Sequence, residues 1–545
     1  MSTGLKETSR PDRQRALIVC THLRRGRTKR RSKHFLQPIS GLHIGSLIDQ
    51  ARYEVTLYHE DWHGPYDTRG CRARYDIVFL TGLQPDFDRM RQLSYHFRRE
   101  GAVVVAGGSI CTLFPEFAAE FFDVVCVGGV DSVADAIADF EAGRLKPIYR
   151  SPQQRITEYR VDYGLFNRHG IRTMPHLIEA SRGCNFRCSF CVVPAEGATH
   201  TSYRLKSVAD AIENAIGTSP RWSLRRLYPM LFFVDNNFSD NRADMLAICD
   251  LLRRHRKVRA WGALVTQNIL RDHELIQRLA HSKCVALFVG LESFDPTFLR
   301  RFNKKQNLSR HGSVIEDIAH AERQGICIMY GYLFDPRAQM VAEMEAQIAA
   351  IVDNPLIPPP TFYSVILPLA GTASFWEDAA AGRLAPNLRL RDLDGETIAY
   401  SNLADAQDKV EAFVKKMALR PHELMSVRQA LRKVLWRTWN ARGFHPLRAY
   451  LFVSSGLRAV FTDGHPANRA SYFAGDETLD PQYAEYPLSI SREDWQRYFA
   501  PIQLTDENGH LASWLSRYVP AERVKDGVPI KNRSGSRPPI EHGVG

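Results

Sequence analysis

Residues 176–191 read HLIEASRGCNFRCSFC, a short β-rich run that leads directly into three closely spaced cysteines. Cys184, Cys188 and Cys191 have the spacing Cys-x3-Cys-x2-Cys on the loop that leaves this predicted strand. Thiolates suit zinc and iron-sulfur clusters, but a structural zinc site takes a fourth Cys or His, and none is in register. Three thiolates can instead hold three irons of a [4Fe-4S] cube and leave the fourth iron open for chemistry.

Six predicted strands, the first of them this run, are each followed by a helical pattern. The alternation indicates a parallel barrel that lacks two of the usual eight units, with its chemistry at the carboxyl ends of the strands. The six runs are HLIEAS (176–181), MLFFVDNNF (230–238), RAWGALVTQ (259–267), VALFVGLES (285–293), CIMYGYLF (327–334) and TFYSVILPL (361–369).

The chain ahead of the cysteines has its own β/α alternation over residues 15–143, with five β-rich runs. This pattern predicts a doubly wound parallel sheet of the flavodoxin type, in which ligands lie beyond the carboxyl ends of the strands. Glycine at these ends allows a bulky ligand to approach the backbone, or it only serves tight turns. The candidate positions are Thr81, Gly82, Gly107, Gly108, Gly128 and Gly129.

A chain of 545 residues exceeds the roughly 250–300 that one core supports, so several domains are expected. In the third of them, PHELMSVRQALRKVLWRTWN is expected to place one apolar face against the barrel, made of Leu424, Val427, Leu431, Val434 and Leu435. The predicted divisions are a polar lead (1–14), a flavodoxin-like domain (15–143), a polar connector (144–175), a partial barrel (176–385), a mainly helical region (386–524) and a disordered tail (525–545).

The composition predicts a cytoplasmic protein, because no window holds ~18 uninterrupted apolar residues and the N-terminus has no signal-peptide core. In that reducing compartment the scattered cysteines are read as small buried apolar residues. The net charge of +12 is concentrated in RRGRTKRRSK (24–33), a predicted mobile loop that could bind an anion. The scattered cysteines are Cys20, Cys71, Cys111, Cys126, Cys249, Cys284 and Cys327.

CNFRCSFC at the mouth of a six-stranded partial barrel resembles the radical S-adenosylmethionine (SAM) superfamily. The motif of that family is Cys-x3-Cys-x-aromatic-Cys, and Phe190 fills the aromatic position. The resemblance implies that the three cysteines hold a [4Fe-4S] cluster whose open iron binds the amino and carboxylate groups of SAM. An external one-electron reductant of the flavodoxin or ferredoxin type then drives release of a 5'-deoxyadenosyl radical.

Other barrel segments resemble positions that the superfamily uses for SAM. Asp235, Asn236 and Asn237 in FVDNNF are candidates for polar contacts, or they only cap a strand and a helix. Glu292 in GLES is a candidate for the ribose hydroxyls or the amino group of SAM, and GYLFDP, with Tyr332, resembles the segment that packs against adenine through its backbone. The resemblance assigns no catalytic acid or base.

The domain in front resembles that of the cobalamin-binding branch, through segments such as VVVAGGSICTLFPE (103–116). One departure is CTHLRRG, where Cys20 stands in place of the aspartate that precedes a cobalt-binding histidine, so His22 is a poor lower ligand. Members of this branch often lack that histidine. Cobalamin is therefore an expected cofactor, and the alternative is a domain that binds nothing or recognises substrate.

The commonest reaction in that branch is methylation of an unactivated carbon or of phosphorus, here in a small metabolite. Radical cyclisation, rearrangement or oxidation are alternatives within the enzymes. An RNA-modifying enzyme is a different class, suggested by the basic charge, but the chain has no recognisable RNA-binding module and no second three-cysteine cluster. A non-enzymatic iron-sulfur electron carrier is the remaining alternative.

Overall fold

Short apolar runs in the first 150 residues form a six-stranded parallel sheet in the computed structural model. Its order, β2-β1-β3-β4-β5-β6, is that of a flavodoxin-like doubly wound sheet, and all five predicted runs contribute a strand. The strands are β1 (Gln14–Cys20), β2 (Tyr53–His59), β3 (Ile77–Gly82), β4 (Val103–Gly108), β5 (Val124–Val127) and β6 (Ile148–Arg150).

The sixth strand corrects one expectation, since β6 lies inside the segment predicted to be a polar connector, 144–175. It pairs in parallel with β5, where Cys126 faces Tyr149. Three residues are too few to show a β-pattern in the sequence. Buried Tyr159 and Tyr163 in the same segment also pack into the core, so the segment is part of the folded structure.

The structure describes residues 13–23, 37–68, 74–151, 157–167, 175–308, 313–419, 421–442, 446–461, 469–479 and 490–520. Within these ranges, no helix has both the length and the apolar content needed to cross a membrane. The basic run 24–33, Cys71 and the predicted disordered tail 525–545 lie outside the described residues.

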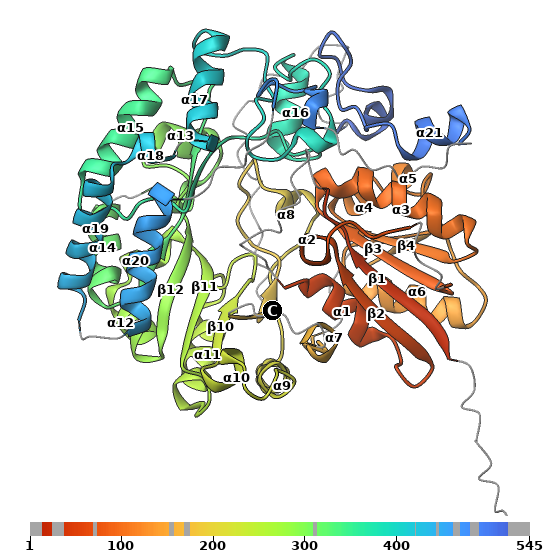
Figure 1. The fold of residues 1–545 in the computed structure, drawn as a ribbon, viewed down its shortest axis with the longest axis horizontal. Coiled ribbons are helices and arrows are strands. Elements are labelled where there is room, and N and C mark those ends of the chain that lie inside the picture. Colours follow the sequence, from red (N-terminus) through yellow and green to blue (C-terminus); the bar gives the residue numbers. More distant parts are fainter. Residues whose placement is uncertain are drawn as a thin grey trace, which may run out of the picture.

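Helices cover both faces of the first sheet (Figure 1). Helix α3 shows why: Met90, Leu93 and Phe97 lie on one side and are buried, as its sequence pattern predicts, and Gly101 follows its end with φ +87°. The helices are α1 (Ile39–Leu47), α2 (Glu60–His63), α3 (Phe87–Arg99), α4 (Ser109–Leu113), α5 (Pro115–Ala118) and α6 (Val130–Glu141).

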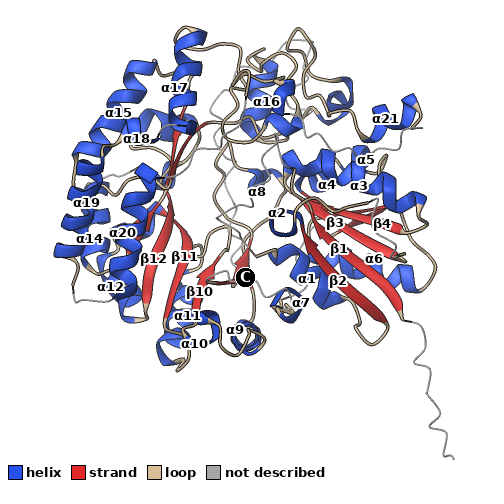
Figure 2. Cartoon of the chain, in the orientation of Figure 1, coloured by secondary structure: helices blue, strands red, loops and turns tan. Residues whose placement is uncertain are grey.

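The second half of the molecule contains a five-stranded parallel sheet, visible beside the first sheet in Figure 2. All six predicted runs contain a strand, but the fifth run is interrupted at Tyr330 and its second part pairs separately with the sixth. The strands are β7 (His176–Ile178), β10 (Met230–Phe233), β11 (Ala260–Thr266), β12 (Cys284–Gly290) and β13 (Cys327–Met329), with the pair β14 (Gly331–Phe334) and β15 (Phe362–Val365).

Helix α7 precedes β7, and the other helices alternate with these strands as expected. Their apolar sides meet side chains such as Trp261, which is buried in the largest core cluster. They are α7 (Gly164–Asn167), α8 (Val192–Ala195), α9 (Leu205–Gly217), α10 (Leu224–Leu227), α11 (Arg242–Arg254), α12 (His273–His281), α13 (Pro296–Arg301), α14 (Val314–Arg323), α15 (Val341–Asp353) and α16 (Ala373–Ala380).

The C-terminal region, which was expected to pack on the barrel, also contacts the first domain. Arg391 Nε donates to Asp88 Oδ2 of α3 at 2.7 Å, and the Trp514 ring stacks on Phe117 of α5 with centroids 3.9 Å apart. Figure 1 shows α21 beside α3, away from α19 and α20. The helices are α17 (Gln407–Leu419), α18 (Pro421–Leu424), α19 (Val427–Asn440), α20 (Pro446–Phe461) and α21 (Arg492–Tyr498).

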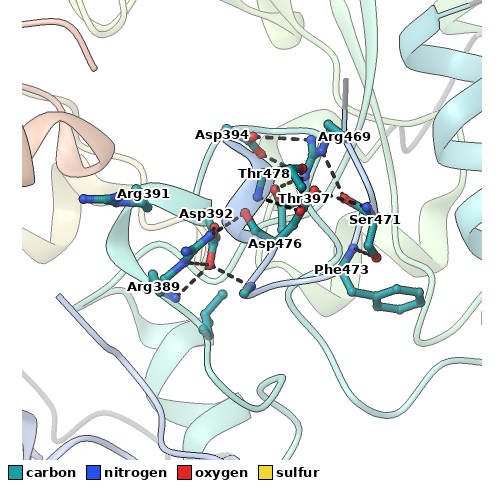
Figure 3. Close-up of polar contacts among 12 residues, drawn as sticks. Arg389, Arg391, Asp392, Asp394, Thr397, Arg469, Ser471, Phe473, Asp476 and Thr478 are labelled. Carbon is teal, nitrogen blue, oxygen red and sulfur yellow. Dashed lines mark hydrogen bonds and ion pairs between the residues drawn. The ribbon is translucent and has the colours of Figure 1, made fainter. Parts of the chain in front are cut away.

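A polar network stabilises the irregular part of the C-terminal region (Figure 3). Arg389 Nη2 donates to Asp392 Oδ1 at 2.9 Å and to the Asp476 carbonyl at 3.0 Å. Arg469 Nη2 donates to Thr397 Oγ1 at 2.7 Å. These hydrogen bonds join residues 389–397 to residues 469–478, and neither segment forms a β-strand.

The prediction that residues 421–440 bury one apolar face is wrong for most of the five residues named. The segment is two helices, because Ser426 caps α19 and ends the run of α18. The side chains that α19 buries include Lys433 and Arg437. Val434 is buried and Leu424 is half-buried, but the other three predicted members are between 45% and 67% exposed: Val427, Leu431 and Leu435.

Candidate active site

The cysteine loop, residues 182–191, leaves β7 through a tight backbone turn. Ser181 and Arg182 pair with Thr201 and Ser202 as a two-stranded ribbon. Gly183 follows with φ +78°, and a Cβ there would lie 2.1 Å from the Thr199 carbonyl oxygen. Only glycine fits this position, so the turn fixes the direction in which the first cysteine leaves the barrel.

The three predicted ligands lie together on this loop. Cys188 is buried and Cys184 and Cys191 are half-buried. Burial, together with smaller contributions from the neighbouring Cys188 and Cys184 sulfurs, raises the pKa of the Cys191 thiol to about 11. A metal cluster therefore displaces protons when it binds here.

The chemistry of the three thiols fits the expected iron-sulfur cluster, because thiolates bind iron and three of them leave one iron of a [4Fe-4S] cube without a protein ligand. Their role as ligands stays a prediction.

The other described cysteines are all buried, as predicted. Burial raises the pKa of each of them, which keeps them as neutral thiols. They are Cys20, Cys111, Cys126, Cys249, Cys284 and Cys327.

Two side chains of the FVDNNF segment hold the entry to the cysteine loop. The Asp235 carboxylate accepts hydrogen bonds from Ala180 N at 3.2 Å and Ser181 Oγ at 2.5 Å, and Asn236 Oδ1 accepts from Gly183 N at 2.9 Å. Burial raises the pKa of Asp235 to about 7. These contacts give the two residues a positioning role, and contact with SAM stays a prediction.

Asn237 lies nearer to the cysteines. Its Nδ2 donates to Asp240 Oδ1 at 3.2 Å, and Asp240 Oδ2 accepts from the backbone N–H of Asn185 at 3.0 Å. Asn237 also hydrogen-bonds the Cys184 thiol and thereby lowers its pKa, although burial raises that pKa more. The segment therefore contacts the loop on both sides of Cys184.

A second segment, residues 302–307, clamps the far end of the loop, and sequence reasoning missed it. Ser189 N–H donates to the Phe302 carbonyl at 3.0 Å, and Asn303 Nδ2 donates to the Arg187 carbonyl at 2.7 Å. Gln306 Nε2 donates to Cys188 Sγ at 3.3 Å. The only sequence signal was a polar run, FNKKQN, after a short helix, and no spacing rule connects it with the cysteines.

Lys304, in the same segment, contacts both Phe190 and Glu292. Lys304 Nζ lies 5.6 Å from the centroid of the Phe190 ring and forms an ion pair with Glu292. Glu292 has φ +64°, a left-handed conformation that is rare and costly for a non-glycine residue. Strained backbone of this kind clusters at functional sites, and contact between Glu292 and SAM stays a prediction.

The Tyr332 side chain is buried and its hydroxyl is hydrogen-bonded within the protein. It is 1% exposed, and its hydroxyl donates to Gln347 Oε1 at 3.0 Å and accepts from Ser293 Oγ and Phe294 N at 3.3 Å. Its backbone pairs with Glu292 in an isolated bridge. Contact between adenine and the backbone of this segment stays a prediction.

The segment PLAGT, 368–372, ties the two halves together. Gln84 Nε2 donates to the Ala370 carbonyl at 2.9 Å, and Gln84 Oε1 accepts from Ala370 N at 3.0 Å. Two residues after the segment, Ser374 donates through N and Oγ to the Ser189 carbonyl, at 2.9 and 3.0 Å. The loop at the end of β3 is therefore connected to the cysteine loop through a short rigid segment.

The glycines of the first domain fall into two groups. A Cβ on Gly82 would lie 2.3 Å from Thr21 Oγ1, on Gly108 2.6 Å from the Gly82 carbonyl and on Gly128 2.3 Å from the Ser151 carbonyl. Packing alone requires these three. Gly107 and Gly129 have no atom closer than 3.9 Å, so they leave open space beside the backbone. Thr81, which precedes Gly82, is half-buried at the same edge.

This glycine edge, the carboxyl ends of β3, β4 and β5, lies next to the cysteine loop. The Cβ position of Gly129 is 3.9 Å from Arg182 Nη1. Ser109, directly after β4, hydrogen-bonds Glu196 just beyond the loop and lowers its pKa, while burial raises it. The open glycines fit a cofactor whose flat face approaches the backbone between the two sheets. A cavity of about 470 Å³ between α3 and α21 includes none of these residues.

Replacing Gln306 with leucine is expected to shift the reduction potential of the bound cluster by about 40 mV to lower values. The hydrogen bond to the Cys188 sulfur stabilises the reduced cluster, which carries more negative charge, by ~1 kcal/mol relative to the oxidised cluster. Losing that bond therefore lowers the reduction potential. Redox titration followed by electron paramagnetic resonance measures it. Gln277→Leu, the same change at an exposed site, is the control, and equal potentials in both variants would contradict the assignment.

Comparisons with known proteins agree with this geometry. Residues 178–342 match the radical SAM superfamily model. The chain is 26% identical to the bacteriochlorophyllide d C-8(2)-methyltransferase of Chlorobaculum tepidum, over 64% of this chain and 77% of that protein. It is 24% identical to the hopanoid C-2 methylase of Rhodopseudomonas palustris, over 47% and 49% of the two chains.

A solved structure has a similar fold. The radical SAM methyltransferase TsrM from Kitasatospora setae superposes with a TM-score of 0.51 at 18% identity, covering 69% of this chain and 78% of that one. The three-cysteine loop, the parallel sheet that carries it and the matched residues all lead to one conclusion. Residues 178–342 belong to the radical SAM superfamily, and the fold of the chain is similar to that of TsrM.

Proposed function

We propose that this enzyme is a cobalamin-dependent radical SAM methyltransferase that methylates an unactivated carbon, or phosphorus, of a small metabolite. The supporting observation is the proximity of the glycine edge to the cysteine loop, with Gly129 beside Arg182. The cofactor that generates the radical and the cofactor that donates the methyl group must both reach the same substrate. The relatives named for methylation of bacteriochlorophyllide d and hopanoids support the same reaction class.

The cofactors supply the reactive species: a [4Fe-4S] cluster with SAM provides a 5'-deoxyadenosyl radical, and cobalamin provides a methyl group. The residues of this chain bind and orient them. Cys184, Cys188 and Cys191 hold three irons. Gln306 donates to the Cys188 sulfur and fixes that ligand.

Glu292 and Lys304 form the charged part of the SAM site. The Glu292 carboxylate accepts hydrogen bonds from the ribose hydroxyls or the amino group of SAM. Lys304 is buried beside it and balances its charge. Phe190 covers the same side of the loop with an apolar ring, which excludes water from the cluster.

The first domain holds the second cofactor at its glycine edge. Gly107 and Gly129 leave space for a macrocycle to lie against the backbone. The Gln84 contacts to Ala370 keep that edge at a fixed distance from the cysteine loop. A protein reductant of the flavodoxin or ferredoxin type supplies electrons from outside.

Anaerobic reconstitution is expected to yield about four irons and one cobalt per chain, because one cube and one corrinoid fit the two sites. During turnover, S-adenosylhomocysteine and 5'-deoxyadenosine should appear together, since one SAM donates the methyl group and another gives the radical. Mass spectrometry of the products measures both. Formation of 5'-deoxyadenosine alone during full turnover would rule out methyl transfer, and protein without cobalt would rule out the corrinoid.

A further inference from the structure

Two basic side chains of helix α19, Lys433 and Arg437, face the interior of the protein. Lys433 Nζ donates to the carbonyls of Ile351 and Ile357, each at 2.7 Å, and Arg437 Nη2 lies 2.7 Å from Glu322 Oε1 on α14. Both side chains are 1% exposed. The contacts that hold this helix on the barrel are therefore polar, which leaves its apolar residues on the other side.

Those apolar residues form a stripe along the outer side of α19. Val427, Leu431, Leu435 and Trp439 follow one another at steps of four residues and are 45%, 47%, 67% and 91% exposed. Figure 1 shows α19 at the outer edge of the molecule. A surface helix normally presents polar residues to water, so a continuous apolar stripe indicates a surface that binds something.

The charges beside the stripe are all positive. Arg428 and Arg432 adjoin it and are exposed, and none of the exposed residues of α19 is acidic. Neither guanidinium has an ion-pair or hydrogen-bond partner among the described residues. An apolar stripe flanked by free arginines is complementary to a surface that is apolar beneath an anionic layer.

A second copy of the chain fits this surface poorly. A symmetric contact would place the same patch on both sides, so arginines would face arginines with no carboxylate between them. A helix of 14 residues is also only about 21 Å long and ~10 Å wide, which is roughly 200 Å² against the ~800 Å² per partner of a stable dimer.

We propose that the outer face of α19 binds the surface of a membrane that contains anionic lipids. The stripe enters the boundary between headgroups and acyl chains, with Trp439 at the headgroup level. Arg428 and Arg432 contact lipid phosphates. The net charge of +12 attracts the whole chain to the same surface. This binding does not depend on the identity of the methylated substrate.

Flotation of the full-length protein with vesicles tests the proposal. Wild type is expected to bind vesicles of phosphatidylcholine with 30% phosphatidylglycerol and to bind pure phosphatidylcholine at least tenfold more weakly. The combined variant Leu431→Ser, Leu435→Ser, Trp439→Ser should lose at least tenfold in binding to the anionic vesicles. The variant Arg428→Gln, Arg432→Gln should lose most of the preference for anionic lipid.

The matched control changes three exposed apolar residues elsewhere, and it should bind like wild type. Circular dichroism melting checks that the stripe variant is folded, which is expected because the altered side chains face solvent. Equal binding by wild type and stripe variant, or no binding by wild type, would overturn the proposal. A wild-type dimer that the stripe variant converts to a monomer in light scattering would also overturn it. The control is Trp222→Ser, Leu224→Ser, Leu227→Ser.

Discussion

Replacing any one of the three loop cysteines with alanine is expected to abolish SAM cleavage and leave the apoprotein folded. A cube held by two thiolates has lost one of its three bonds to the protein, which leaves a second iron without a protein ligand. The loop backbone itself is held by other residues, through Asn236, Phe302 and Ser374. Iron content and 5'-deoxyadenosine formation should both fall to the level of a protein-free blank.

The control for this experiment is another cysteine. Cys249 is buried in α11, outside the loop, and Cys249→Ala should retain iron and activity at a cost of ~1 kcal/mol in stability. Thermal melting of the apoproteins distinguishes the two causes of failure. An active Cys188→Ala variant with a full iron content would disprove the ligand assignment.

Replacing Glu179 with glutamine is expected to destabilise the contact between the two halves by about 3 kcal/mol. Glu179 Oε2 lies 3.1 Å from Nε2 of His43 on α1 and 3.0 Å from Nε of Arg182. His43 belongs to the first domain, and the other two residues belong to the barrel. Glutamine leaves the half-buried guanidinium of Arg182 without its carboxylate, which is costly where an ion pair is shielded from water.

The same group predicts a pH dependence. Burial raises the pKa of Glu179, but Arg182 and His43 together outweigh burial and hold it at about 2, below the ordinary 4.5. Its stabilising effect is therefore complete above about pH 4.5 and is lost as the pH falls towards 2. Burial also lowers the pKa of His43, so protonation of this imidazole at low pH destabilises the folded state as well.

Urea unfolding at several pH values measures this effect. Wild type should lose stability between pH 4.5 and 2.5 more steeply than Glu179→Gln, because only wild type has the carboxylate to protonate. Glu158→Gln is the matched control, since that carboxylate is exposed and pairs with Arg160 on the surface. If Glu179→Gln unfolds at the same urea concentration as wild type at pH 7, the ion network does not hold the halves together.

The strands and the cysteine loop could be predicted from the sequence because their signals are local. Runs such as DIVFLTG carry their own burial pattern, and Cys184 to Cys191 span eight residues. Gln306 and Ser374 could not be predicted, since their contacts with the loop depend on how distant segments fold together. The same holds for α19. The spacing correctly placed Leu431 and Leu435 on one face of the helix. The buried face is a different one, because Arg437 pairs there with Glu322, which lies far away in the chain.

The clamps on the cysteine loop also constrain the order of assembly. Asn236 reaches Gly183 across 53 residues, Gln306 reaches Cys188 across 118 and Ser374 reaches Ser189 across 185. Closing such long loops requires most of the barrel to be in place first. A nascent chain therefore cannot present a finished thiol site as soon as its cysteines are synthesised. Iron enters late, so the presence of a complete cluster reports that the whole barrel has folded.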